Sequence, residues 1–241
     1  MKSYTIHLIR HGITKGNEEG RYIGRTDLPL SENGAAQLRR LRRAGGYPQA
    51  QAYFTGPQKR CLETLRLLYP ESKPIVIDGF RECDFGDWEG KTAEEIAAGD
   101  SRFAAWISGG GGNVTPPHGE GGGAFMQRVC ASFEKVTEGM LRSGVTSAAL
   151  VAPGGALMAI LSAYGLPRAK FYDWMTESGC GYSVRIMPEL WMRSMVAEVY
   201  SKIPAVEPDP EDSGRIIIDL ARRAADEAFG QEEEDSGEPE K

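Results

Sequence analysis

Segments rich in β-forming residues alternate with segments of helical spacing along most of the chain, from Tyr4 to Tyr164. Four such segments predict strands: YTIHLIR (4–10), AQAYFTG (50–56), PIVID (74–78) and SAALVA (147–152). A helix between two strands returns the chain to the end of the sheet where the first strand began, so that the next strand runs parallel to it. This alternation therefore predicts an α/β fold. Its central sheet is mostly parallel and has helices on both faces.

Capping residues and apolar spacing predict the helices. Ser31 is an N-cap candidate for residues 31–44, and Pro57 occupies the first position of a helix over 57–69. Further helices are predicted at 93–98, 103–107, 124–141 and 155–164. Near the end, GYSVRIM (181–187) and SMVAEVYSKI (194–203) predict antiparallel or edge strands joined by a short turn near Pro188.

Three segments depart from this regular pattern. Residues 108–123, SGGGGNVTPPHGEGGG, are too rich in Gly and Pro for regular structure and predict a mobile loop. We expect one folded domain over residues 1–203, a linker and an amphipathic helix over 204–230, and an acidic disordered tail over 231–241. The C-terminal helix either covers the core or makes a homodimer contact.

Charge and composition exclude several classes of protein. The formal net charge is −6, but the last twelve residues hold six carboxylates and one lysine, so the rest of the chain carries −1. With no stripe of basic and aromatic residues, a nucleic-acid partner is not expected. The segment MKSYTIHLIRHG lacks a long apolar stretch and no run of about 18 apolar residues occurs, so we expect a cytoplasmic protein without a membrane partner. Four cysteines without a CxxC pair support neither disulfides nor structural zinc.

Chemistry-bearing residues follow three of the predicted strands. Arg10 and His11 follow the first strand, residues 56–60 the second, and Pro153 and Gly154 the strand ending at residue 152. In parallel sheets the carboxyl ends of the strands line the ligand crevice, so these residues are expected to converge.

Each of the three segments suits phosphoryl transfer. In RHGITKGN, His11 can act as a nucleophile that becomes phosphorylated, with the Arg10 guanidinium beside it. In TGPQKRCLET, Arg60 lies in the first turn of a helix whose N-terminus favours negative charge. In RECDFGDWEG, Glu82 lies among aromatic residues that would raise its pKa and suit it to protonate a leaving oxygen.

The sequence resembles the histidine phosphatase superfamily, also called phosphoglycerate-mutase-like, and within it the small bacterial phosphatases of the α-ribazole phosphatase type. The resemblance rests on LIRHGITKGNEEGRYIGRTDLPLSENG, GPQKRCLET and ECDFGDWEG and extends from Tyr4 to about Tyr200. It implies a three-layer α/β/α sandwich, no metal or other cofactor, and a small phosphorylated metabolite as substrate. The implied site roles are His11 as nucleophile, Glu82 as proton donor, Arg10 and Arg60 as phosphate ligands, Asn17 and Thr14 as supporting contacts, and Gly24 at the pocket rim.

One position departs from the family pattern. The family's later strand-to-helix turn reads Ala-His-Gly-Gly, whereas this chain has Pro153 at the histidine position, followed by Gly154 and Gly155. The glycines still let a phosphate approach the helix start. Losing one donor to the transition state typically slows the reaction by about 10²–10³-fold. We therefore expect phosphate binding with weak or absent turnover.

The remaining histidines and pocket residues carry weaker expectations. His7 is expected to be a buried structural residue, and His118 either an exposed loop residue or a substitute for the missing histidine. Tyr22 and Trp106 are expected to shape the substrate pocket together with the 108–123 segment.

Three functions stay open at this stage. The first is a metal-independent phosphomonoesterase, and the second is a pseudophosphatase that binds a phosphate ester without turnover. A phosphoglycerate mutase is the third and ranks last, because the nearly uncharged 108–123 segment suits a bisphosphate poorly.

Overall fold

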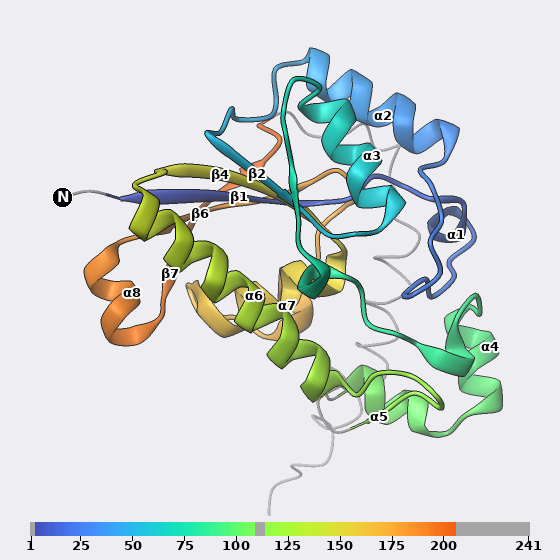
Figure 1. The fold of residues 1–241 in the computed structure, drawn as a ribbon. Coiled ribbons are helices and arrows are strands. Elements are labelled where there is room, and N and C mark those ends of the chain that lie inside the picture. The colour runs from blue at the N-terminus through green and yellow to red at the C-terminus, as the bar shows by residue number, and fades with distance from the viewer. Residues whose placement is uncertain (1–2, 109–113, 206–241) are drawn as a thin grey trace, which may run out of the picture.

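A computed structural model of the chain describes residues 3–108 and 114–205 and contains one sheet of seven strands within them. The strand order is β3-β2-β4-β1-β6-β7-β5 (Figure 1). The strands are β1 (Tyr4–Arg10), β2 (Ala52–Thr55), β3 (Ile75–Val76), β4 (Ser147–Ala152), β5 (Gly165–Leu166), β6 (Gly181–Ile186) and β7 (Ala197–Ile203).

The pairing is mostly parallel, as the alternation of strands and helices predicts. β1, β2, β3 and β4 pair with one another in parallel, and β5 is parallel to β7. β6 runs antiparallel to both β1 and β7. The carboxyl ends of β1, β2 and β4 therefore meet at one edge of the sheet, where the Gly56 N–H bonds to the Val151 carbonyl.

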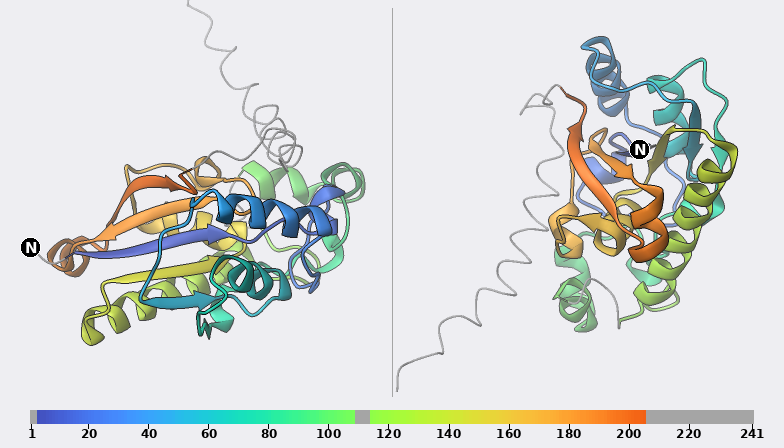
Figure 2. Two further views of the ribbon diagram at one scale, coloured as in Figure 1. Left: turned by 90° about the horizontal axis from the view of Figure 1, so that it is seen from above. Right: turned by 90° about the vertical axis from the view of Figure 1, so that its left-hand side faces the viewer.

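Helices cover both faces and complete a three-layer sandwich. Figures 1 and 2 show α2 (Glu32–Arg43) and α3 (Lys59–Leu68) on one face and α6 (Gly122–Ser143) and α7 (Gly154–Tyr164) on the other. The shorter helices are α1 (Lys15–Glu18), α4 (Ala93–Gly99), α5 (Arg102–Ser108) and α8 (Pro188–Ser194), with 3₁₀ turns η1 (Asp78–Phe80), η2 (Gly86–Trp88) and η3 (Phe171–Trp174). This confirms the predicted α/β/α architecture.

Apolar side chains divide between the two faces by the alternation of each strand. On β1, Ile6 and Leu8 point into the larger core cluster with α6 and α7, whereas Ile9 packs with Leu38 and Leu65 in the smaller one under α2 and α3. His7, between Ile6 and Leu8 in the sequence, is buried. Its Nδ1 hydrogen-bonds to the Ser183 hydroxyl at 2.8 Å. This is the structural role expected of His7.

Two predicted elements differ in the structure. The short turn expected near Pro188 is wrong, because Pro188 opens the seven-residue helix α8, and proline is well suited to the first position of a helix. The helix expected from Pro57 begins two residues later, at Lys59, with Gln58 as its N-cap.

The Gly/Pro-rich segment is partly helical and partly held in place. Residues 109–113 lie outside the described residues. Of the rest, Gly122 and Gly123 belong to α6 rather than to a loop, and backbone bonds join Asp87 N–H to the Pro117 carbonyl and Glu120 N–H to the Asp84 carbonyl. The described part of the segment is thus attached to the strand-end loop around residue 84.

The predicted linker, C-terminal helix and acidic tail fall almost wholly on residues 206–241, outside the described residues, and stay predictions. β7 ends at Ile203, two residues before the end of the described chain. Across the residues that the structure describes, no helix combines the length and apolarity needed to cross a membrane.

Candidate active site

His11 follows β1 directly and is held by its backbone and ring. Its N–H bonds to the Ala152 carbonyl of β4, and its Nδ1 lies 2.7 Å from the Gly12 carbonyl. Because a carbonyl only accepts, Nδ1 carries the proton and Nε2 keeps its lone pair. Burial, reinforced by Arg60 and Arg10, lowers the pKa of His11 well below 6.5, so the ring is neutral at pH 7. A neutral imidazole with a free Nε2 can act as a nucleophile.

Arg10 lies beside His11 at the end of β1. Its Nη1 donates to the carbonyl of Thr176, in the loop after η3. Within the described residues its buried Nε has no hydrogen-bond partner. The guanidinium therefore retains a donor near the start of α7, where an ideal Cβ on Gly154 would lie 3.2 Å from Nε.

Thr14 and Asn17 form the first turn after the His11 loop. Thr14 is fully buried and caps α1, accepting from the Asn17 N–H and donating through its hydroxyl to Asn17 Oδ1 at 2.9 Å. With Oδ1 engaged twice by Thr14, the amide NH₂ is the group of Asn17 left to donate. Asn17 lines the cavity described below, and Thr14 fixes its position from behind.

Arg60 contributes its charge from behind the site. It lies in the first turn of α3, as predicted, but is only 1% exposed and does not line the cavity. Its Nη1 donates to the Thr26 carbonyl and its Nη2 to the Gly24 carbonyl, both at 2.9 Å. The structure thus differs from the direct phosphate contact that the resemblance implies for Arg60. Buried arginines need acceptors for their N–H groups, and the carbonyls of this loop accept from Nη1 and Nη2, whereas the buried Nε has no hydrogen-bond partner within the described residues.

Glu82 meets the start of α7. Its Oε1 accepts from the Cys83 N–H at 2.9 Å and its Oε2 from the Gly155 N–H at 3.1 Å. Burial raises the pKa of Glu82, although the Cys83 N–H, Arg60, the Gly155 N–H and Arg10 oppose the shift. The direction agrees with the sequence expectation, and its largest cause is burial of the carboxyl. A carboxyl of raised pKa suits proton donation near neutral pH.

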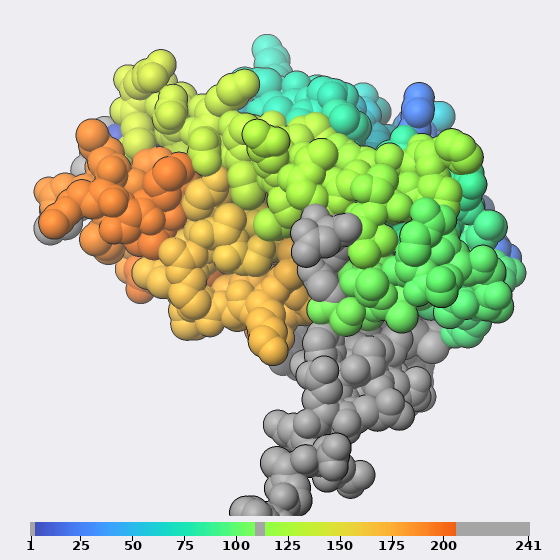
Figure 3. All heavy atoms as spheres, turned by 90° about the horizontal axis from the view of Figure 1, so that it is seen from below, coloured from blue at the N-terminus to red at the C-terminus, as the bar shows by residue number. Residues whose placement is uncertain are grey.

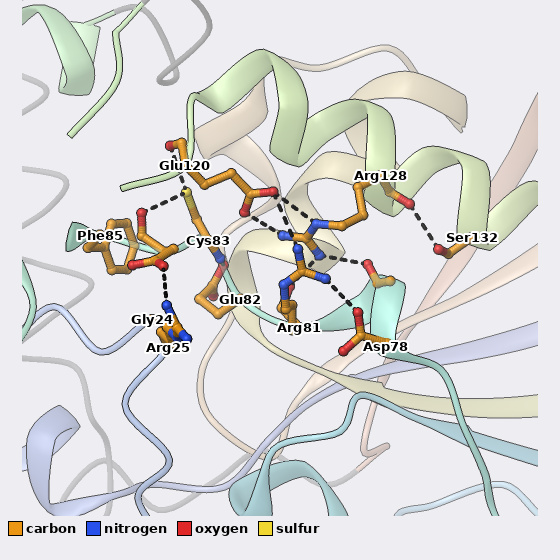
Figure 4. Close-up of polar contacts among 12 residues, drawn as sticks. Gly24, Arg25, Asp78, Arg81, Glu82, Cys83, Phe85, Glu120, Arg128 and Ser132 are labelled. Atoms are coloured by element: carbon orange, nitrogen blue, oxygen red, sulfur yellow. Dashed lines mark hydrogen bonds and ion pairs between the residues drawn. The ribbon is translucent and has the colours of Figure 1, made fainter. Parts of the chain in front are cut away.

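A partly buried ion pair holds the segment that carries Glu82, as Figure 4 shows. Arg128 of α6 donates through Nε to Glu120 at 2.9 Å, pairs with it again through Nη2, and reaches the Gly79 and Arg81 carbonyls through Nη1. The Glu120 carbonyl in turn lies 3.5 Å from the Cys83 sulfur. The residues before and after Glu82 are thus attached to α6. Sequence reasoning missed Arg128, since nothing in its helix distinguishes it from other surface arginines.

Two further polar side chains connect the loops and were also missed. Gln58 accepts from the Glu82 N–H and donates to the Gly24 carbonyl at 2.6 Å. Glu89 accepts from the backbone N–H groups of Gly24 and Arg25, at 3.0 and 2.7 Å. The backbone of Gly24 is therefore held by side chains from other segments, since its carbonyl accepts from Gln58 and Arg60 and its N–H donates to Glu89. Gly24 does not line the cavity itself, although its neighbour Ile23 does.

Pro153 ends β4 as the N-cap of α7. Its φ of −63° and ψ of 158° are ordinary for both proline and an N-cap, and its carbonyl accepts from the Leu157 N–H. Pro153 is buried and does not line the cavity, whereas Gly154 and Gly155 do. The proline thus preserves the backbone path of the turn while offering no side-chain donor.

One cavity of about 200 Å³ gathers most of these groups. Arg10, His11, Asn17, Glu82 and Gly154 line it together, and so do Tyr22 and Trp106. The convergence expected from the strand ends is therefore present for β1 and β4, whereas none of residues 56–60 after β2 lines the cavity and Arg60 lies behind it.

His118 lies elsewhere. It does not line the cavity, its side chain is 85% exposed, and its Nδ1 lies 3.1 Å from the Asp87 carboxylate. It has a φ of 58° in a Gly-rich turn, which directs the ring to the surface. The prediction that His118 lies in the substrate pocket is therefore wrong, whereas the alternative prediction, an exposed loop residue, agrees with the structure.

No cluster of three or more His, Cys, Asp or Glu side chains suited to a metal ion occurs in residues 3–108 and 114–205. The donor set around His11 consists of cationic and neutral N–H groups, which suits an anion rather than a metal ion.

Comparisons with known proteins show which sequence family and which solved structures this chain resembles. The sequence model of the histidine phosphatase superfamily (branch 1) matches residues 6–195. An adenosylcobalamin/α-ribazole phosphatase from Salmonella typhimurium is 27% identical over 186 residues, which cover 75% of this chain and 90% of the relative. An α-ribazole phosphatase structure from Shigella flexneri superposes with a TM-score of 0.67 at 24% identity, covering 84% of this chain and 99% of that one. A phosphoglycerate mutase structure from Thermus thermophilus gives 0.62 at 30% identity, with coverage of 84% and 99%.

Proposed function

Since the chain belongs to the histidine phosphatase superfamily, we propose that it hydrolyses a small phosphate monoester through a phosphohistidine formed on His11. The proposal includes Glu82 as the proton donor, Arg10, Asn17 and the start of α7 as phosphate contacts, and Arg60 as a buried positive charge behind them. Its setting is the cytoplasm, and its substrate a phosphorylated metabolite.

One observation carries the proposal. A neutral His11 with its Nε2 lone pair free lines the same cavity as a cation with an unpartnered N–H, Arg10, and a carboxyl of raised pKa, Glu82. Phosphoryl transfer depends mainly on positioning and on stabilising charge, and these three groups provide both.

The reaction proceeds in two steps. In the first, His11 Nε2 forms a bond to phosphorus while the ester P–O bond breaks, and the Glu82 carboxyl gives its proton to the leaving alcohol oxygen. In the second, the Glu82 carboxylate takes a proton from water as the water oxygen attacks phosphorus. The N–P bond then breaks, inorganic phosphate leaves, and both residues return to their starting states.

Pro153 favours a second candidate function, a pseudophosphatase that binds a phosphate ester with little or no turnover. A donor missing from the transition state costs about 10²–10³-fold in rate. Arg10 and Asn17 bind the ground state as well, so phosphate affinity is expected to survive.

A mutase activity ranks third. Its substrate carries a second anionic group, and Arg21, the other arginine lining the cavity, is engaged by Glu19 and Glu95.

The test pairs two variants with the natural chain. Incubation with p-nitrophenyl phosphate is expected to leave acid-labile phosphate on the protein, and His11→Ala is expected to abolish it. Pro153→His should raise hydrolysis across a panel of phosphate monoesters by about 10²-fold or more. Vanadate binding without hydrolysis would select the pseudophosphatase. The absence of both vanadate binding and phosphohistidine would refute the proposal.

A further inference from the structure

The cavity continues beyond the phosphate contacts into a space lined by aromatic and apolar side chains. On one side is a wall of Tyr22, Phe85 and Trp106, here called the Trp106 wall. The lining also includes Phe171, Tyr172 and Met175 from the segment around η3, here called the Phe171 wall. Figure 3 views the molecule from the side on which the 100–108 region and the region around η3 both come to the surface.

The Trp106 wall is already assembled by its own ring contacts. Tyr22 and Phe85 lie edge to face with centroids 5.2 Å apart, and Phe85 and Trp106 do the same at 6.1 Å. Trp106 also stacks edge to face on the buried Trp88 at 5.6 Å. Interlocked rings of this kind lose little freedom when a ligand binds, so an apolar group can be bound without prior ordering of this wall.

The Phe171 wall has a similar chemistry. Phe171 and Tyr172 make an edge-to-face pair with centroids 5.2 Å apart. Met158 of α7 and Met175 add two polarizable side chains, which adapt readily to flat rings. A planar aromatic group fits between two such walls better than a strongly hydrated sugar or carboxylate.

Charge in the outer part of the cavity argues against a second anionic group on the ligand. Besides Arg10, the described lining contains one arginine or lysine, Arg21, whose Nε donates to Glu19 and whose Nη1 donates to the Gly90 carbonyl. Glu94, in the first turn of α4, lines the same region and is anionic. A second phosphate or a carboxylate there would meet Glu94 and no free cation.

The volume limits the size of the group. A cavity of about 150 Å³ in another protein holds one benzene molecule. The roughly 200 Å³ here must also accommodate part of the phosphate. This leaves space for one ring or two fused rings, the second partly exposed.

We propose that the ligand of this site is a phosphate monoester of an uncharged aromatic alcohol of one or two rings, bound with its ring between the Trp106 wall and the Phe171 wall. This inference rests on the proposed function for the phosphate end and adds the chemistry of the alcohol.

The test uses phosphonates, which bind but are not hydrolysed, so it does not depend on how active the chain is. Calorimetry on the full chain compares methylphosphonate, benzylphosphonate, naphthylmethylphosphonate and carboxyethylphosphonate. The two aromatic phosphonates are expected to bind at least about tenfold tighter than methylphosphonate, because they bury apolar surface that it lacks. Carboxyethylphosphonate is expected to bind no better than methylphosphonate.

Two variants locate the preference. Phe171→Ala should reduce the ratio of aromatic phosphonate affinity to methylphosphonate affinity by about fivefold or more. Met158→Lys, on a half-buried and flexible side chain, should weaken aromatic binding and favour carboxyethylphosphonate. The matched control is Tyr200→Ala, an exposed aromatic residue of β7 outside the cavity lining, which should change none of these affinities.

The outcomes separate this inference from the proposed function. If methylphosphonate binds and the aromatic phosphonates bind no tighter, or if the Phe171→Ala preference equals that of the Tyr200→Ala control, the aromatic ligand is refuted and the phosphate site stands. If no phosphonate binds and no phosphohistidine forms, the proposed function fails and this inference fails with it.

Discussion

Gly155 allows the Glu82 carboxyl to approach the start of α7, so Gly155→Ala should displace the proton donor. An ideal Cβ at position 155 would lie 2.3 Å from Glu82 Oε1 and 3.0 Å from its Cδ. The obstructing group is the end of a side chain, so the carboxyl moves and the backbone stays. α7 itself favours alanine over glycine.

The magnitude follows from that distance. An ordinary contact begins near 3.4 Å, so Glu82 Oε1 must withdraw by roughly 1 Å, and its partner oxygen loses the 3.1 Å bond from the Gly155 N–H. A misplacement of about 1 Å at a reacting group can cost about 10²-fold in rate. Arg10, His11 and Asn17 are untouched, so phosphate affinity should be unchanged.

The leaving group makes the assay specific. An alkyl alcohol needs a proton as it leaves, whereas p-nitrophenolate leaves without one. Gly155→Ala should therefore lower kcat about 10²-fold for an alkyl phosphate and only a few-fold for p-nitrophenyl phosphate. If the natural chain turns over too slowly to measure, both substitutions are compared in the Pro153→His background.

The matched control is Gly139→Ala, within α6, where an added Cβ meets no described atom within 4 Å. It should leave kcat unchanged and raise the free energy of unfolding by about 0.5–1 kcal/mol. Equal losses on both substrates in Gly155→Ala would refute Glu82 as the proton donor. An unchanged kcat on the alkyl phosphate would refute the steric argument.

Three further predictions concern stability and the loops around the site. Burial lowers the pKa of His11 well below 6.5. As the pH falls below 6.5, the imidazole of His11 therefore becomes protonated in the unfolded chain but stays neutral in the folded one. Stability should therefore drop from pH 7 to pH 5.5, and His11→Gln should remove up to about 1.4 kcal/mol per pH unit of that slope in urea unfolding. Parallel curves for the two proteins would contradict this. Arg128→Ala leaves Glu120 and two backbone carbonyls without their donor and should cost about 2–3 kcal/mol in unfolding free energy and lower kcat. Arg142→Ala, at an 82% exposed position of the same helix, should change stability by less than about 0.5 kcal/mol, and similar values for both would argue against the ion-pair role. Glu89→Ala removes the acceptor of the Gly24 and Arg25 N–H groups and should increase hydrogen exchange at both amides, whereas unchanged exchange would show that the carboxylate does not hold this loop.

Much of the fold could be predicted because it depends on local patterns. The alternation of strands and helices determines the parallel sheet. Ser31 marks the start of α2, and the start predicted at residue 155 is one residue from that of α7. Errors arose where a short segment has two acceptable conformations. After β6, a proline followed by Glu and Leu suits either a turn or a short helix, and packing of Trp191 in the core decides for α8.

The candidate site was predictable as a set of strand-end residues but not in its contacts. That His11, Arg10 and Glu82 line one cavity follows from the sheet topology. That Arg60 bonds to carbonyls of residues 24 and 26, or that Arg128 holds the segment before Glu82, depends on distances between loops far apart in sequence. Neither residue type nor spacing encodes such distances.

The bond from Arg10 to the Thr176 carbonyl connects the two ends of the ligand site. Arg10 is a proposed phosphate contact, while Thr176 follows Met175, a member of the Phe171 wall. We therefore expect the free energies with which the site binds the charged end and the ring-bearing end of a ligand to depend on each other. A double-mutant cycle between Arg10 and Phe171 should show non-additivity, so the affinity for a whole ester cannot be obtained by adding the affinities of its fragments.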